Sequence, residues 1–101
     1  MPKNVTKERV LSAMTIDTYL DAAVSQLPNQ WHVVEQEIVS LNRYEAGRLV
    51  IEVTYAGVSA KQLIYIIKDN NTIWSITFST SADEYDLRLP AFEQSIRTFV
   101  T

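Results

Sequence analysis

Apolar residues recur at helical spacing in one early segment of the chain, residues 15–27. Its apolar members are Ile16, Leu20, Ala23, Val24 and Leu27. Because they fall three or four positions apart, they predict an amphipathic helix with one face against a core. Thr15 can cap the first turn, Asp17 suits the positive end of the helix dipole, and Pro28 ends the helix.

From residue 31 the period of the pattern changes to two, which predicts strands. Residues 31–41 are rich in β-branched and aromatic side chains but have a polar middle, and they predict a strand with a bulge. Residues 42–47 have the composition of a turn. Residues 48–55 then alternate between polar and apolar types, with Val50 as the exception, and predict a half-buried strand.

The run Leu63–Ile67 is apolar at every position, which predicts a strand covered on both faces. Asn70 and Asn71 indicate a hairpin, because asparagine tolerates positive φ. Residues 72–79 follow as a strand, with Trp74, Ile76 and Phe78 on one side. Four consecutive strands of this kind predict an antiparallel meander.

A second amphipathic helix is expected at the end of the chain. Ser81 and Glu84 have the spacing of a capping box, and Pro90 suits the first turn of the main helical segment. The apolar stripe of that segment is Leu89, Phe92, Ile96 and Phe99.

The order of these elements predicts the α+β class, with an antiparallel meander sheet of four to six strands. Residues 3–10 are a candidate edge strand. Since residues 63–67 have no polar face, either the two helices lie on opposite sides of the sheet or something else covers its second face. We favour the first, an α/β/α sandwich in which the whole chain, 1–101, is one domain.

Composition and charge narrow the classes of function. The chain is 47% hydrophobic, with nine Lys and Arg against twelve Asp and Glu, and its basic residues are scattered singly. Nucleic acid is therefore a poor partner, since phosphate binding needs clustered cations. The chain has no cysteine, which excludes disulfides, thiolate metal sites and thiol nucleophiles.

No apolar run approaches the roughly 20 residues that a membrane-spanning helix needs. We expect no transmembrane segment and a chain that is soluble as given. The compartment stays open: cytoplasmic if Met1 is the native start, and extracytoplasmic if an export signal has been removed.

Three groups of residues are candidates for chemistry. His32 is the single histidine and could titrate or bind a metal, but a structural or surface role is favoured. Glu35 and Glu37 could act as paired carboxylates, although a solvated strand is the simpler interpretation. Residues 83–86 hold three carboxylates, Asp83, Glu84 and Asp86, which suit a helix N-terminus better than a cation site. We therefore predict no catalytic residues, cofactor or metal.

A candidate partner or ligand surface is formed by aromatic residues and the histidine. Its members are Trp31, His32, Tyr55, Tyr65 and Trp74. Most of the aromatic residues are also explained by packing in the core, because aromatic side chains account for much of the burial in small domains.

The sequence resembles the PsbP-like superfamily, which includes the bacterial DcrB-like proteins. The matching stretches are Asn4-Val5 with Lys7-Glu8, Thr15–Leu20, Trp31–Glu37, Ala46–Leu49, and Tyr85 with Leu89–Phe99. The resemblance implies helices on both faces of an antiparallel sheet, no catalytic machinery, and an accessory or binding role. The chain departs from many relatives in its shorter front and in lacking an export signal or an anchoring cysteine.

Members of that family serve in photosystem assembly, as envelope lipoproteins, or as chaperones for apolar segments of secretion effectors. We therefore expect a non-enzymatic module that binds another protein through a sheet edge or a shallow groove. A second copy of the chain is an alternative partner, because edge strands can pair. Two other functions stay open: binding of a small ligand, and a chaperone for apolar segments of a partner.

Overall fold

The computed structural model describes residues 3–10 and 13–99. Within them, five strands, two α-helices and one 3₁₀ turn follow one another along the chain. Their bounds are β1 (Lys3–Arg9), α1 (Ile16–Ser25), β2 (Trp31–Leu41), β3 (Tyr44–Tyr55), β4 (Val58–Asp69), β5 (Thr72–Ser81), η1 (Ala82–Glu84) and α2 (Tyr85–Phe99). The predicted α+β class is confirmed.

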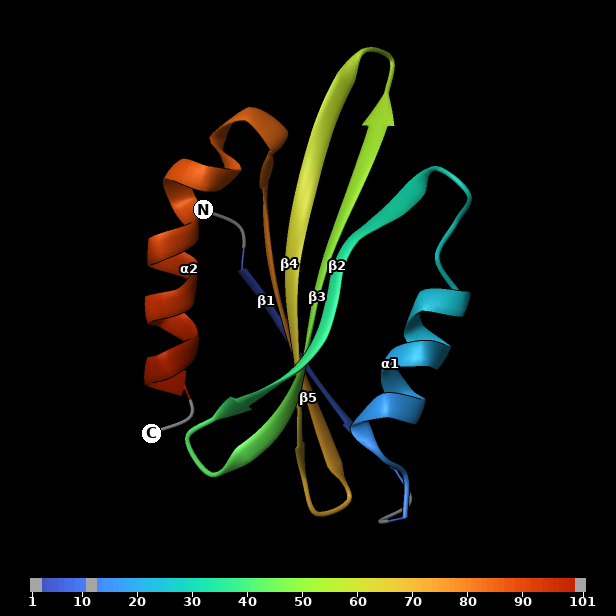
Figure 1. The fold of residues 1–101 in the computed structure, drawn as a ribbon, viewed down its shortest axis with the longest axis vertical. Helices are drawn as coiled ribbons and strands as arrows, with labels where there is room; N and C mark the ends of the chain where they lie inside the picture. Colours follow the sequence, from blue (N-terminus) through green and yellow to red (C-terminus); the bar gives the residue numbers. More distant parts are fainter. Residues whose placement is uncertain (1–2, 11–12, 100–101) are drawn as a thin grey trace.

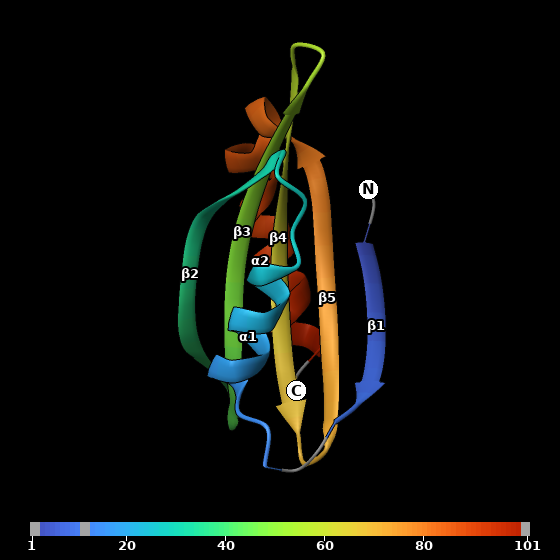
Figure 2. The ribbon, with the colours of Figure 1, turned by 90° about the vertical axis from the view of Figure 1, so that its right-hand side faces the viewer.

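The strands form one open antiparallel sheet in the order β1-β5-β4-β3-β2 (Figure 2). The predicted meander from β2 to β5 is confirmed, and residues 3–9 do form an edge strand, paired with β5. The predicted bulge in β2 is also present, because the register shifts between Val33 and Glu35. β1 and β2 are the two edges of the sheet.

The two helices lie on opposite sides of the sheet (Figure 1), and β4 shows why. Leu63, Tyr65 and Ile67 belong to the core on the α2 side, whereas Ile66 packs with Leu20 on the α1 side. Each of these β4 residues is at most 3% exposed. The prediction that this apolar run is shielded on both faces is confirmed.

Local chemistry holds α1 in place. The side chain of Thr15 accepts a hydrogen bond from the amide of Thr18 at 3.2 Å, which is the expected N-cap. Ile16 and Leu20 point into the core, and both lie against Gly47 of β3. A Cβ at Gly47 would sit 3.3 Å from each of their side chains, so glycine permits this close approach of helix and strand.

Two expectations for β3 were wrong. The turn predicted over residues 42–47 is only Asn42 and Arg43, and β3 already begins at Tyr44. Asn42 adopts φ 59°, which closes the hairpin in two residues. The strand is also not half-buried, because Ala46 and Val50 on its α2 side are fully buried.

Two expectations for the C-terminal helix were also wrong. Ser81 makes no capping hydrogen bond, because it is still paired with Ala60 in the sheet and the chain leaves β5 through η1. Pro90 does not start a new segment but lies inside a continuous α2. One helical hydrogen bond is lost at the proline, yet the helix is anchored on either side of it by buried Tyr85 and Phe92.

In residues 3–10 and 13–99, no helix combines the length and the apolar character needed to cross a membrane. Met1, on which the prediction about the compartment depends, lies outside the described residues.

Candidate functional site

A groove lies between α2 and the β2–β3 hairpin, on the face of the sheet that α2 occupies. Helix α2 packs mainly on β5 and leaves part of β2 and β3 uncovered. The groove encloses a cavity of about 700 Å³. Its lining residues are Glu37, Val39, Ser40, Leu41, Asn42, Arg48, Tyr65, Glu93, Ile96 and Arg97. A cavity of this size is in the usual range for ligand sites.

One part of the groove is apolar. Val39 and Leu41 come from β2, and their alternate positions put both side chains on the α2 side of the sheet. Ile96 faces them from α2, three residues after Glu93 on the same side of the helix. Val39 and Leu41 are only partly buried, so this apolar surface is accessible from the groove.

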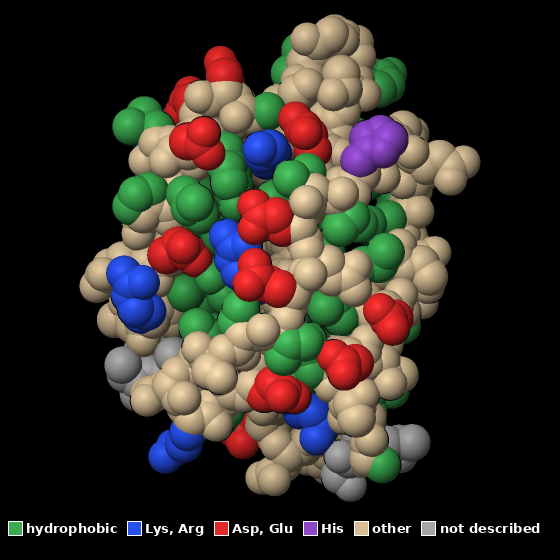
Figure 3. Space-filling model, in the orientation of Figure 1, with side chains coloured by type: hydrophobic (Ala, Val, Ile, Leu, Met, Phe, Trp, Pro, Cys, Tyr) green, Lys and Arg blue, Asp and Glu red, His purple; other side chains and the backbone are tan. Residues whose placement is uncertain are grey.

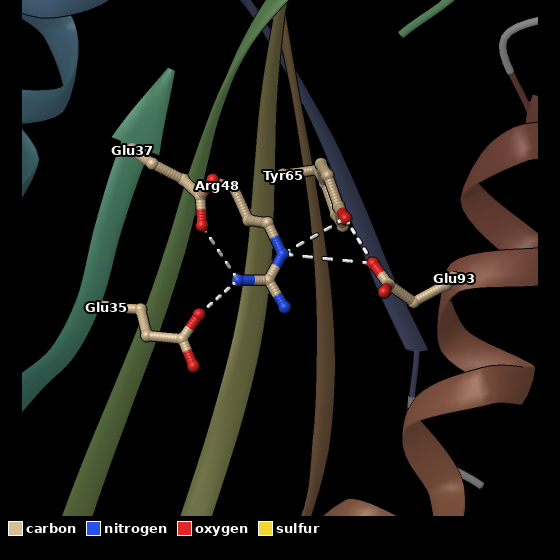
Figure 4. Close-up of polar contacts among 5 residues, drawn as sticks. All are labelled: Glu35, Glu37, Arg48, Tyr65 and Glu93. Carbon is tan, nitrogen blue, oxygen red and sulfur yellow. Dashed lines mark hydrogen bonds and ion pairs between the residues drawn. The ribbon is translucent and has the colours of Figure 1, made fainter. Parts of the chain in front are cut away.

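The other part of the groove is lined by members of a charged cluster around Arg48 (Figure 4), in which Glu35 contacts Arg48 but does not itself line the groove. Arg48 Nη1 lies 2.6 Å from the carboxylate of Glu35 and 3.4 Å from that of Glu37. Arg48 Nε lies 3.8 Å from the carboxylate of Glu93 and donates a hydrogen bond to the hydroxyl of Tyr65 at 3.2 Å. The Tyr65 hydroxyl in turn donates to Glu93. We call these five residues the Arg48 cluster.

The sheet register brings the cluster together. Glu37 on β2 and Tyr65 on β4 are the direct cross-strand neighbours of Arg48, one on each side. Glu35 lies two residues before Glu37 on the same face of β2, and its cross-strand neighbour is Val50. Residues from three strands and one helix therefore meet at one guanidinium.

Burial and pairing fix the charge states of two members of the cluster. Burial by itself would lower the pKa of Arg48, but hydrogen bonds with Glu35 and Tyr65 raise it overall. Burial, followed by the hydrogen bond to Glu93, raises the pKa of Tyr65 to about 12. At neutral pH Arg48 is therefore a permanent cation and Tyr65 a neutral donor, and neither is poised for proton transfer.

The carboxylates of the cluster are accessible, whereas its cation is not. The Arg48 side chain is 11% exposed, but those of Glu35 and Glu37 are about half exposed. Figure 3 shows charged side chains interleaved with hydrophobic ones on the face where α2 meets the sheet. The groove thus combines an apolar wall with a charged rim, in which the exposed carboxylates lie around Arg48 and Arg97 lies beside Ile96.

The structure does not bring the predicted aromatic surface together. Trp31 packs on the α1 side, whereas Tyr65 and Trp74 lie on the α2 side. Tyr55 is 76% exposed near the tip of the β3–β4 hairpin. His32 is exposed and lies opposite Glu52 on β3. Of these five residues, only Tyr65 lines the groove.

The carboxylates singled out in the sequence have two different roles. Glu35 and Glu37 are exposed, as expected, but they are ion-paired with Arg48 rather than simply solvated. Asp83 and Glu84 lie in η1 and Asp86 in the first turn of α2, the helix start that was predicted for them. Within the described ranges, no three His, Cys, Asp or Glu side chains are grouped to hold a metal ion.

Sequence reasoning missed Arg48 and Glu93. Arg48 lies two residues before Val50, so the two side chains share one face of β3, and the structure shows that this face is buried. This spacing was the sequence signal that could have pointed to Arg48. No sequence signal pairs Glu93 with it, since the two are 45 positions apart and meet only because α2 packs on this face.

No known protein-family profile matches this chain, and no curated protein is similar to it in sequence. The fold is similar to that of a solved structure described as a protein of unknown function and a proposed regulator, PA94 from Pseudomonas aeruginosa. The TM-score is 0.70 at 13% identity, over 97% of this chain and 83% of the other. At that identity the likeness concerns the fold alone.

Proposed function

We propose that this chain is a non-enzymatic interaction module whose groove receives an amphipathic helical segment of another protein. The observation that supports this most strongly is the apolar surface of Val39 and Leu41 on β2, which are only partly buried and lie in the groove beside the buried Ile96 of α2. Apolar surface gathered in a groove is favourable to bury and is typical of sites that take the apolar face of a helix.

The shape of the groove favours a helix over a strand as the occupant. Strands lie about 4.8 Å apart, so β2 and β3 together offer a floor roughly 10 Å wide, close to the diameter of a helix. The backbone groups between β2 and β3 are already paired with each other. A segment on this floor can therefore gain only side-chain contacts, which suits a helix.

The chemistry of the Arg48 cluster supports a binding role. Its guanidinium is ion-paired with the carboxylates in a fixed arrangement, and Tyr65 holds its proton far above neutral pH. His32 is exposed and lines neither the groove nor the second described cavity, next to the start of α1. The resemblance to PsbP-like and DcrB-like proteins, which implies a binding role, supports the same proposal.

NMR titration tests the proposal, with a designed 18-residue amphipathic helical peptide as the probe. We expect amide shifts at Val39, Leu41 and Ile96, and loss of binding in Val39→Glu. The matched control is Val33→Glu, on the α1 side of the same strand. Saturable shifts elsewhere, or equal binding by both variants, would contradict the proposal.

A small apolar ligand is the alternative occupant, because the cavity volume of about 700 Å³ would accommodate one. The two cases differ in the extent of the contact. A helix would shift residues along the whole length of the groove, from Glu37 to Arg97. A fluorescent apolar dye that binds Val39→Glu more weakly, together with failure of every peptide, would favour the small ligand.

A further inference from the structure

We infer that the groove selects a helical segment that carries lysine or arginine side chains beside its apolar face. This inference rests on the proposed function and adds the charge of the partner. It begins with the balance of charge in the Arg48 cluster, where the carboxylates of Glu35, Glu37 and Glu93 surround a single guanidinium. The cluster therefore has a formal charge of −2 (three negative, one positive).

The exposed parts of the cluster are its negative parts. The side chains of Glu35, Glu37 and Glu93 are 48%, 51% and 32% exposed, whereas that of Arg48 is 11% exposed. Each carboxylate has two oxygens and can accept further hydrogen bonds while it keeps its contact with Arg48. A cation on a bound helix can therefore reach the carboxylates without displacing the arginine.

A buried hydroxyl near the cluster lacks a hydrogen-bond partner among the described residues. Tyr85 is 4% exposed, and its hydroxyl has no hydrogen-bond partner. Tyr85 lies close enough to Arg48, Glu35 and Glu93 to feel their charges. Buried hydroxyls are normally hydrogen-bonded, but Tyr85 belongs to the core and is not among the residues that line the groove, so the charge preference of the groove comes from its exposed carboxylates.

The apolar wall and the carboxylates are adjacent, and this sets the pattern of the partner. Glu37 and Val39 are two positions apart on one strand face, and Glu93 and Ile96 are neighbours on one helix face. A helix that packs its apolar stripe on Val39 and Leu41 presents the flank of that stripe to the carboxylates of Glu37 and Glu93. Arg97 lines the groove one residue after Ile96, so the cations of the partner belong beside the Arg48 cluster and away from Arg97.

Three peptides with one apolar face test the inference, their flanking positions filled by lysine, glutamine or glutamate. At low salt we expect the lysine peptide to bind about fivefold more tightly than the glutamine peptide, and the glutamate peptide to bind more weakly than both. The advantage of lysine should shrink as salt is added, because salt screens exposed charges.

Glu37→Gln, checked for folding by circular dichroism, should reduce the advantage of the lysine peptide over the glutamine peptide. Glu45→Gln is the control, since Glu45 lies on β3 and faces the second cavity near α1. Equal binding of all three peptides, or preference for the glutamate peptide, would overturn the inference while the proposed function stands. If no peptide bound in the groove, the proposed function itself would fail.

Discussion

Arg48 and Tyr65, direct neighbours on β3 and β4, are joined by a hydrogen bond of 3.2 Å from Nε to the tyrosine hydroxyl. The same hydroxyl donates to Glu93 of α2. The contact therefore links the floor of the groove to the helix that forms its wall. The ring of Phe92 on α2 also stacks on the ring of Phe78 on β5, with ring centroids 4.8 Å apart. This apolar contact holds α2 against the sheet as well.

Tyr65→Phe removes the hydroxyl that links Arg48 to Glu93 and keeps the aromatic ring in place. We expect a loss of about 1–2 kcal/mol in the free energy of unfolding, because the Nε of Arg48 and the carboxylate of Glu93 each lose a partner in a partly buried site. Unfolding in urea measures this loss in the free energy of unfolding. Tyr55→Phe is the control, since Tyr55 is 76% exposed and its hydroxyl has no contact of this kind. Equal stability of the two variants would show that the link contributes nothing.

Alkaline pH should weaken the same link. The pKa of Tyr65 is raised to about 12 by burial and by its bond to Glu93, whereas an unfolded tyrosine titrates near 10. The folded state therefore favours the neutral form, so this stabilisation is complete below about pH 10 and is lost as the pH rises through 12. Unfolding measured from pH 8 to 11.5 should show a decline that is smaller in Tyr65→Phe. Parallel curves would contradict the raised pKa.

Most of the fold could be predicted from the pattern of the sequence. The run Leu63–Ile67 has no polar position, and this alone requires cover on both faces and so places the helices. Thr15 caps the start of α1, and the helix ends at Ser25, shortly before Pro28, because capping and helix breaking are local effects. The predictions were wrong where tertiary contacts override local preferences. Pro90, for example, stays inside α2 because residues on either side of it are buried.

The site could be predicted only in fragments. Glu35 and Glu37 were noticed because they are adjacent in sequence, and Tyr65 because it is aromatic. Their meeting with Arg48 depends on the register of two strand pairs, and a shift of one residue would turn Arg48 to the other face. Glu93 joins only through the docking of α2, which no local pattern specifies.

Gly47 should be intolerant of larger side chains. A Cβ there would lie 3.3 Å from the side chains of Ile16 and Leu20, tighter than ordinary contact. We expect Gly47→Ala to cost about 1 kcal/mol and Gly47→Val about 3 kcal/mol in stability, because α1 must move away from β3. In a double-mutant cycle, Leu20→Ala should recover part of the loss in Gly47→Val. Additive losses would indicate that the helix does not limit the space at this position.

Removal of Arg48 should leave three carboxylates without their common cation. We expect Arg48→Met to lower the free energy of unfolding by about 2 kcal/mol at pH 7. This is less than the loss expected for a fully buried ion pair, because the side chains of Glu35 and Glu37 are about half exposed. Arg88→Met is the control, because the exposed pair of Arg88 and Glu84 should contribute less than about 0.5 kcal/mol. Equal losses in both variants would contradict the role given to Arg48.

The alternative partner is a second copy of this chain. Pairing between two copies should depend on the charges of the two edge strands of the sheet, which are opposite in sign. The exposed edge strand β1 carries Lys3, Lys7 and Arg9 against one glutamate. At the other edge, β2 carries Glu35 and Glu37 and has neither lysine nor arginine.

Pairing of like edges would set like charges against each other, whereas β1 of one copy against β2 of the next would attract. Such a head-to-tail contact does not close at two copies. Light scattering at low salt should therefore show an average mass that rises with concentration above 11.5 kDa, and that falls in about 0.5 M salt. Lys7→Glu should weaken the association. A dimer of fixed mass that is insensitive to salt would instead indicate an apolar interface, for which exposed Val33, Val34 and Ile38 are available on β2.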